Sequence, residues 1–214
     1  MHPYLFELAS LMAIFAFVIV SPGADLAMVM RQSLTHGRRP AIVTSFGIGT
    51  ALLFHVTYTI LGLGLIISQS IYLFNIIKWC GVAYLVYIGI KSLMAGKMDL
   101  SGDAAPDSAA RKKDQSGWKA YMLGFAANAL NPKPVFFFLS IFSTVVGAHT
   151  PIAVKFGYGV AMASCLIVWF VGVSLFMTTP QMRAAFSRAS QWIDRASGVV
   201  FILLGLKLAT EKAG

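Results

Sequence analysis

Two charged residues lie deep inside long apolar stretches of this 214-residue chain, and each has a proline nearby. Asp25 ends the run Ser-Pro-Gly-Ala-Asp, and Lys133 lies between Pro132 and Pro134. A charge at the centre of a membrane helix costs about 2.5–3.5 kcal/mol, so it should face the protein interior and have a partner. The Asp25 carboxylate could carry a proton or bind an ammonium group, and the Lys133 ammonium could bind a carboxylate. This pair predicts an amino acid zwitterion as ligand, although other small polar solutes would fit as well.

Both charges also have structural explanations that the residues leave open. Asp25 could cap the free N–H groups where a helix restarts after Gly23. Lys133 could form a lasting ion pair with Asp25, and a pair that opens for substrate would combine both roles. Two flanking prolines argue against regular helix at Lys133 and leave carbonyl groups free to contact an ammonium group. Asn128 and Asn131 add amide groups nearby.

Six apolar segments are long enough to place these residues within a bilayer. The first and fourth are too long for simple spans, so we expect each to be a helix broken near its middle, at Pro22 and at Pro132. The six segments cover about residues 4–34, 41–68, 71–93, 118–146, 152–177 and 193–209.

The two halves of the chain repeat. Pro22 and Pro132 are 110 residues apart, and Phe-Gly-Ile-Gly at 46–49 returns as Phe-Gly-Tyr-Gly at 156–159 with the same offset. Because each repeat holds an odd number of spans, the second copy must be inserted upside down relative to the first. Both breaks then meet near the middle of the bilayer. The positive ends of the restarting half-helices would point at the same place and favour an anionic group.

The composition indicates a single integral membrane domain. Hydrophobic residues make up 57% of the chain and charged residues 12%, against about 25% charged residues in a soluble domain. We therefore predict an all-α membrane domain over residues 1–214, with repeat one at 1–94, a flexible cytoplasmic linker at 95–117 and repeat two at 118–214. The net charge of +9 does not indicate nucleic-acid binding, because the basic residues occur in short tracts between apolar segments. Glycine-rich helix faces would allow a homodimer without requiring one.

The basic residues predict the orientation in the membrane. Twelve lie between segments one and two, three and four, and five and six, whereas four lie on the other side. The positive-inside rule places the larger group in the cytoplasm and both termini outside. The twelve are Arg31, Arg38, Arg39, Lys91, Lys97, Arg111, Lys112, Lys113, Lys119, Arg183, Arg188 and Arg195.

No pattern in the sequence indicates an enzyme, a cofactor or a metal centre. The chain has no HExxH, GxSxG or Walker-type motif, and we expect no second aspartate within a span. His55 is a lone histidine, which is more typical of a hydrogen-bonded helix contact than of a proton relay. Without a nucleotide site, a gradient must drive transport. One elementary charge crossing 100 mV releases about 2.3 kcal/mol, enough for roughly 50-fold accumulation.

Several motifs resemble the LysE-type superfamily of amino acid exporters, in particular its homoserine/threonine (RhtB) branch. The resemblance covers nearly the whole chain, and residues 174–183 with 191–194 are similar to the threonine efflux proteins. The other matching elements are Ser-Pro-Gly-Ala-Asp at 21–25, Gln-Ser-Leu at 32–34, Gly-Arg-Arg at 37–39, Gly47-Ile48 to His55, and Asn131-Pro132-Lys133.

The resemblance implies export of threonine, homoserine or a related neutral amino acid across the bacterial inner membrane, driven by the proton-motive force. Ala24 and Pro134 stand where the family usually has proline and alanine, so the exact substrate stays open. A metal-ion exporter of the same superfamily is the alternative, but it would need clustered ligands. A membrane thiol carrier is a third hypothesis. It would need cysteines at matching places in the two halves, and Cys80 and Cys165 do not correspond under the repeat.

Overall fold

The chain forms a bundle of helices. The computed structural model describes residues 3–98, 115–147, 149–176 and 179–211, with the side chains of 63–69 outside that description. The described residues contain helices and no strand, which confirms the all-α class. The helices are α1 (Pro3–Val20), α2 (Ala24–Thr35), α3 (Arg38–Gln69), α4 (Ile71–Leu93), α5 (Gly117–Ala129), α6 (Pro132–Thr144), α7 (Ile152–Phe176) and α8 (Pro180–Thr210).

The surface of the bundle is apolar and several polar groups lie inside it. Four helices, α1, α3, α4 and α7, are long and apolar enough to cross a membrane. Phe6, Trp79 and Val168, on three of these helices, are 65%, 56% and 71% exposed. Conversely, His55 and Asn128 are buried. A bundle surrounded by lipid can expose apolar side chains, whereas its polar groups must find partners inside the protein.

Two interruptions divide what we predicted as the first and fourth spans. Residues 21–23, including Pro22, separate α1 from α2, as predicted. The second interruption lies at Leu130 and Asn131, and Pro132 is the first residue of α6 rather than part of the break. Lys133 is therefore helical, and the expectation of irregular backbone there was wrong. The first-turn N–H groups of a helix have no partner within it, so prolines at 132 and 134 cost no hydrogen bond.

The last helix begins much earlier than predicted. We expected a span at 193–209, but α8 runs from Pro180 to Thr210. Residues 180–192 mix arginine, serine and glutamine with apolar side chains, so they do not register as an apolar span. Proline at the first helical position favours a start there. Arg183 and Arg188, which we expected in a connection, therefore lie on α8.

Two pairs of helices pack backbone against backbone. A Cβ atom added to Gly47 of α3 would overlap a carbonyl oxygen of α5, and one added to Gly124 of α5 would overlap a carbonyl oxygen of α3. Likewise, a Cβ on Gly89 of α4 would lie 2.9 Å from the Gly198 carbonyl oxygen of α8. A Cβ on Gly198 would lie 2.7 Å from the Gly89 carbonyl oxygen. Small residues at such crossings let membrane helices approach closely. Each pair joins a helix before the linker to a helix after it.

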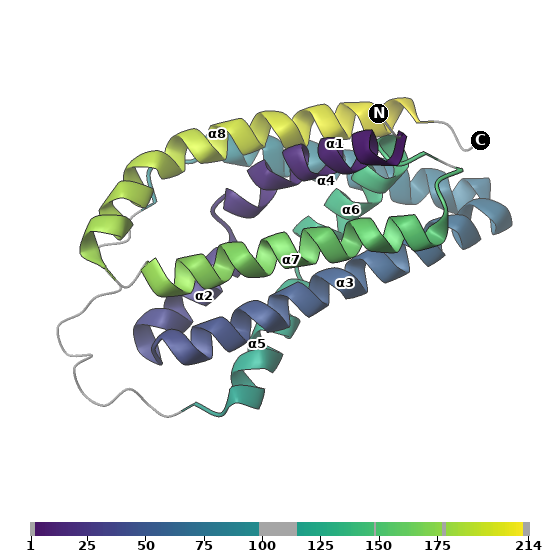
Figure 1. The fold of residues 1–214 in the computed structure, drawn as a ribbon. Coiled ribbons are helices and arrows are strands. Elements are labelled where there is room, and N and C mark those ends of the chain that lie inside the picture. The colour runs from purple at the N-terminus through teal and green to yellow at the C-terminus, as the bar shows by residue number, and fades with distance from the viewer. Residues whose placement is uncertain (1–2, 99–114, 148, 177–178, 212–214) are drawn as a thin grey trace.

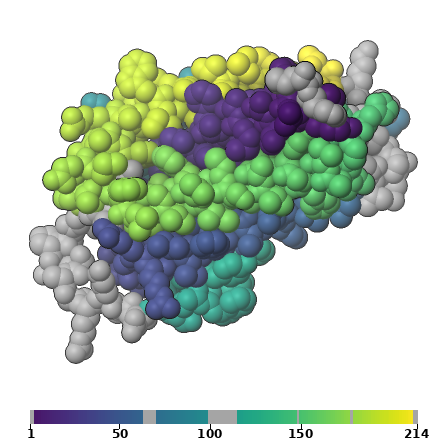
Figure 2. All heavy atoms as spheres, in the orientation of Figure 1, coloured from purple at the N-terminus to yellow at the C-terminus, as the bar shows by residue number. Residues whose placement is uncertain are grey.

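Figure 1 shows how the bundle is arranged, with both chain termini at one end and the end of α4 and start of α5 toward the other. In Figure 2, α1 forms a strip of the surface between α7 and α8. Near the chain termini, the Glu7 carboxylate of α1 accepts hydrogen bonds from the hydroxyls of Thr150 and Tyr158, both at 3.0 Å, and from the Gly147 N–H at 3.1 Å. Glu7 thus ties α1 to α7 and to the connection before it.

The predicted linker is described only at its two ends. Residues 99–114, to which most of that prediction refers, lie outside the described residues. Both backbone polar groups of Met98 form hydrogen bonds with side chains of α8. Its N–H donates to the Ser190 hydroxyl at 3.0 Å, and its carbonyl accepts from the Ser187 hydroxyl at 2.5 Å. The first part of the linker is therefore attached to α8.

Candidate functional site

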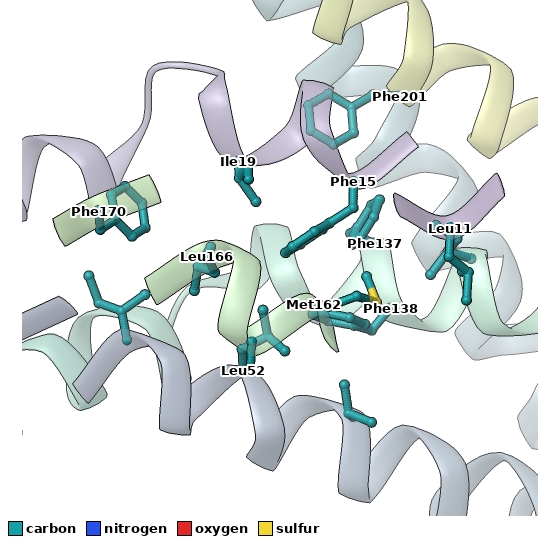
Figure 3. Close-up of a cluster of buried hydrophobic side chains, with 14 of the residues drawn as sticks. Leu11, Phe15, Ile19, Leu52, Phe137, Phe138, Met162, Leu166, Phe170 and Phe201 are labelled. Atoms are coloured by element: carbon teal, nitrogen blue, oxygen red, sulfur yellow. The ribbon is translucent and has the colours of Figure 1, made fainter. Parts of the chain in front are cut away.

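The two interruptions meet at one small cavity of about 50 Å³. Polar groups from both interruptions line one part of it, and apolar side chains line the rest. Figure 3 shows the apolar wall, where Phe15 of α1, Phe137 of α6 and Leu166 of α7 converge. The polar lining consists of Ser21, Asp25, Asn128, Asn131 and Lys133.

Asp25 and Asn128 are joined across the two interruptions. The Asn128 side-chain amide donates to Asp25 Oδ2 at 2.8 Å. The remaining oxygens, Asp25 Oδ1 and Asn128 Oδ1, are buried and accept no hydrogen bond from the residues that the structure describes. A buried acceptor without a donor costs about 1–3 kcal/mol. The pair therefore offers two acceptors to a ligand that carries N–H groups.

Asp25 lies in the first turn of α2 but does not cap it. The N-cap residue is Gly23, which is extended at φ −178° and ψ −173°, and no side chain accepts a hydrogen bond from the backbone there. The capping role that we considered for Asp25 is therefore wrong. Its charge still lies at the positive end of the α2 dipole, which stabilises a carboxylate.

His55 ties α3 to the end of α5. Its Nε2 lies 3.0 Å from the Asn128 carbonyl oxygen, and because a carbonyl can only accept, this nitrogen carries the hydrogen. In the neutral ring, Nδ1 then accepts from the Tyr58 hydroxyl at 2.6 Å. His55 is fully buried and stacks on Phe138 with 6.3 Å between ring centroids. These contacts fix the position of Asn128 and, through it, of Asp25.

The Lys133 ammonium lies near two carboxylates without bonding to either. Its Nζ lies 5.1 Å from the ring centroid of Phe201 on α8 and interacts electrostatically with Asp25 and Asp194. Among the described residues it forms no hydrogen bond or ion pair with either carboxylate, so the lasting ion pair with Asp25 is not formed. The Lys133 backbone N–H donates to Asn131 Oδ1 at 3.0 Å, which makes Asn131 the cap of α6.

An open cleft of about 350 Å³ lies on the other side of Lys133. Asp194 of α8 and Lys91 of α4 line it together with Lys133. Asp194 is 6% exposed, and its Oδ1 accepts a hydrogen bond from the Ser21 hydroxyl at 3.4 Å. The expectation that no second aspartate lies within a span was wrong, because Asp194 falls in the predicted segment 193–209 and is buried on α8. Lys133, with Gly23, Ala24 and Asn131, lines both the cavity and the cleft.

Sequence reasoning missed Asp194 because it placed the start of the last span at residue 193, which left this aspartate at a boundary. A helical signal was present. The residues that α8 buries recur every three or four positions, with two adjacent pairs among them, so Asp194 lies on the inward face of a continuous helix. They are Phe186, Ser190, Asp194, Ser197, Gly198, Phe201, Leu204, Gly205 and Leu208.

The structure brings most of the predicted site residues together, with one exception. Pro22 lines the cleft and Gly23 lines both the cavity and the cleft. Pro132 is exposed and lines neither. The two cysteines lie apart from this region on α4 and α7, with Cys80 exposed. In the described parts of the chain, no three histidine, cysteine, aspartate or glutamate side chains gather in a group that could hold a metal ion.

Comparison with known proteins agrees with these features. Residues 16–212 match the LysE type translocator family. The chain is 30% identical to the threonine efflux protein of Salmonella typhi over 194 residues, covering 91% of this chain and 93% of that protein. It is 28% identical to the homoserine/homoserine lactone efflux protein of Salmonella typhimurium over 197 residues, covering 90% and 91%. No solved structure gives a significant match.

Proposed function

Since the chain belongs to the LysE type translocator family and is a multi-pass protein of the bacterial inner membrane, we propose that it exports a small neutral amino acid, threonine or homoserine. Proteins named for the efflux of these two amino acids are similar to it along nearly their whole length. In this proposal Asp25, Asn128 and Lys133 bind the substrate in the cavity between the two helix interruptions.

One observation carries the proposal. Asp25 and Asn128, each with one buried oxygen that accepts no hydrogen bond from the described residues, line the same small cavity as Lys133. An amino acid supplies an ammonium group for the two acceptors and a carboxylate for Lys133. Hydrogen bonds to charged groups contribute about 1.5–3 kcal/mol each, so the site favours a zwitterion over a neutral polyol or a simple cation.

The size of the site favours a small substrate. A cavity of about 50 Å³ holds about four water molecules, at the 10–15 Å³ that each requires. That is enough for an ammonium and a carboxylate group. Gly23, Asn131 and Lys133 also line the larger cleft, so a short side chain such as that of threonine can extend there. A bulky side chain held within the cavity itself would have to displace the phenylalanines of its apolar wall.

Proton exchange at Asp25 supplies the coupling in this proposal. A proton and a substrate ammonium group compete for the same carboxylate oxygen, so binding one releases the other. Outward movement of substrate can therefore be exchanged for inward movement of a proton. Asn128 donates to Oδ2 and leaves Oδ1 available for either partner.

We propose six spans for the membrane topology: α1 with α2, α3, α4, α5 with α6, α7, and α8. They would form two inverted repeats, a topology that is supported by an interrupted helix in the same place in each half. The excess of basic residues on one side supports cytoplasmic placement of the linker and external termini.

Counterflow in proteoliposomes tests the function. Vesicles containing purified protein are loaded with unlabelled threonine and diluted into labelled threonine, with and without an imposed pH gradient. We expect transient accumulation of label, inhibition by homoserine, and a change in rate with the gradient. Labelled manganese in the same vesicles tests the metal-ion alternative. Manganese flux in vesicles that show no amino acid counterflow would replace the proposal by that alternative.

A further inference from the structure

We propose that Asp194 is a coupling residue, whose carboxylate neutralises the Lys133 ammonium in place of the substrate carboxylate once substrate has left and Asp25 has taken up a proton. This inference rests on the function proposed above. It assigns a role to a buried aspartate that binding alone does not use.

The geometry places Asp194 where it can serve Lys133. Both residues line the open cleft, and the Lys133 ammonium rests against Phe201, which lies two helical turns beyond Asp194 on the same face of α8. The Ser21 hydroxyl holds Asp194 weakly, at 3.4 Å. Lysine has a flexible four-carbon stem, so its ammonium can turn between Asp25 and Asp194 while both helices stay in place.

Charge balance requires such an alternative partner. With both carboxylates ionised, Asp25, Lys133 and Asp194 together carry a net charge of −1. With substrate bound, its ammonium group neutralises Asp25 and its carboxylate neutralises Lys133, while Asp194 keeps the hydrogen bond from the Ser21 hydroxyl. Without substrate, a proton neutralises Asp25, and Lys133 is left without a partner unless Asp194 supplies one.

The other charged and titratable groups near Asp194 do not take this role. Lys91 and Tyr84 of α4 line the same cleft. Lys91 is exposed, so water screens its charge. Arg195 follows Asp194 but is also exposed and stacks on Trp192, with 5.4 Å from its guanidinium carbon to the ring centroid.

Two kinds of transport separate coupling from binding. In counterflow the carrier returns with substrate bound and never needs the Asp194–Lys133 pair. In net efflux the carrier returns without substrate and does need it. Loss of the pair should therefore stop net efflux and spare counterflow.

Asp194→Asn is the direct test. Asparagine still accepts the Ser21 hydrogen bond but cannot neutralise Lys133. We expect threonine counterflow within about twofold of wild type, and net efflux driven by a pH gradient lower by at least about tenfold, because an unpaired ammonium in a bilayer is strongly disfavoured. Asp194→Glu, which keeps the carboxylate, should restore part of the net efflux. Arg195→Gln, a neighbouring exposed change, should leave both rates unchanged.

The outcomes distinguish the possible failures. If Asp194→Asn leaves both rates unchanged, or lowers both in parallel, Asp194 has no coupling role and the inference is wrong. If wild-type protein shows no amino acid counterflow, the proposed function itself is wrong.

Ser21→Ala is a second test that does not depend on the folding of Asp194→Asn. It frees Asp194 to pair more strongly with Lys133 and to compete with substrate. The threonine concentration that gives half-maximal counterflow should rise severalfold, and an unchanged value would also overturn the inference.

Discussion

Replacing Asp25 by asparagine should weaken substrate binding while preserving the fold. The new amide is nearly the same size as the carboxylate, and its oxygen can still accept the hydrogen bond from the Asn128 side chain that now measures 2.8 Å. What disappears is the second oxygen, Oδ1, which is buried without a donor. An N–H₂ group takes its place and repels an ammonium group.

The expected loss follows from the interaction removed. A hydrogen bond to a charged group contributes about 1.5–3 kcal/mol. At about 1.4 kcal/mol per tenfold change, the threonine concentration for half-maximal counterflow should rise by about 10- to 100-fold. Dependence of the rate on an imposed pH gradient should vanish, because the amide does not take up a proton in the accessible pH range.

Counterflow of labelled threonine, measured over a range of concentrations and in parallel with thermal unfolding in detergent, checks this prediction. Glu211→Gln is the matched control. It makes the same chemical change at the end of α8, where the backbone carbonyl rather than the side chain accepts the Lys78 hydrogen bond at 2.9 Å. The control should behave as wild type. An Asp25→Asn protein with unchanged half-saturation and unchanged pH dependence would refute the role of this carboxylate.

Three further predictions test the scaffold. Gly47→Ala places a methyl group against a backbone carbonyl of α5 and should lower the free energy of unfolding by about 1–3 kcal/mol. Gly62→Ala should be neutral or slightly stabilising, because no atom lies within 4 Å of the added methyl group. Thermal unfolding of the two variants compares them. His55→Gln should raise the half-saturating threonine concentration by displacing Asn128, and an unchanged value would show that His55 does not position the site. A fluorescent reporter fused after Gly214 should stay dark in the periplasm, and cytoplasmic fluorescence would reverse the proposed orientation.

Hydropathy located most helices because a bilayer imposes length and apolarity on each span. The predicted segment 71–93 coincides with α4, and 41–68 lies within α3. The start of α8 was not predicted, because its first residues mix polar and apolar side chains and do not form an apolar segment. Irregular backbone was expected at Lys133 because prolines were treated as helix breakers, and their compatibility with a first helical turn was overlooked.

The sequence indicated which charged residues line the candidate site, but not which side chains bond to one another there. Charge within apolar segments singled out Asp25 and Lys133 from their types and places in the chain. Their arrangement in space depends on contacts between residues more than one hundred positions apart in the sequence. The hydrogen bond from Asn128 to Asp25 is one such contact, so it could not be inferred. The same holds for Asp194, whose burial depends on the packing of α8 against the first interruption.

The glycine contacts between α3 and α5, and between α4 and α8, also constrain biosynthesis. A ribosome delivers α3 and α4 into the bilayer before either partner has been translated, so their glycine faces must first meet lipid. Neither helix can reach its final packing until the later half of the nascent chain arrives. The early half must consequently persist as a partly packed intermediate until α5 and α8 have been synthesised.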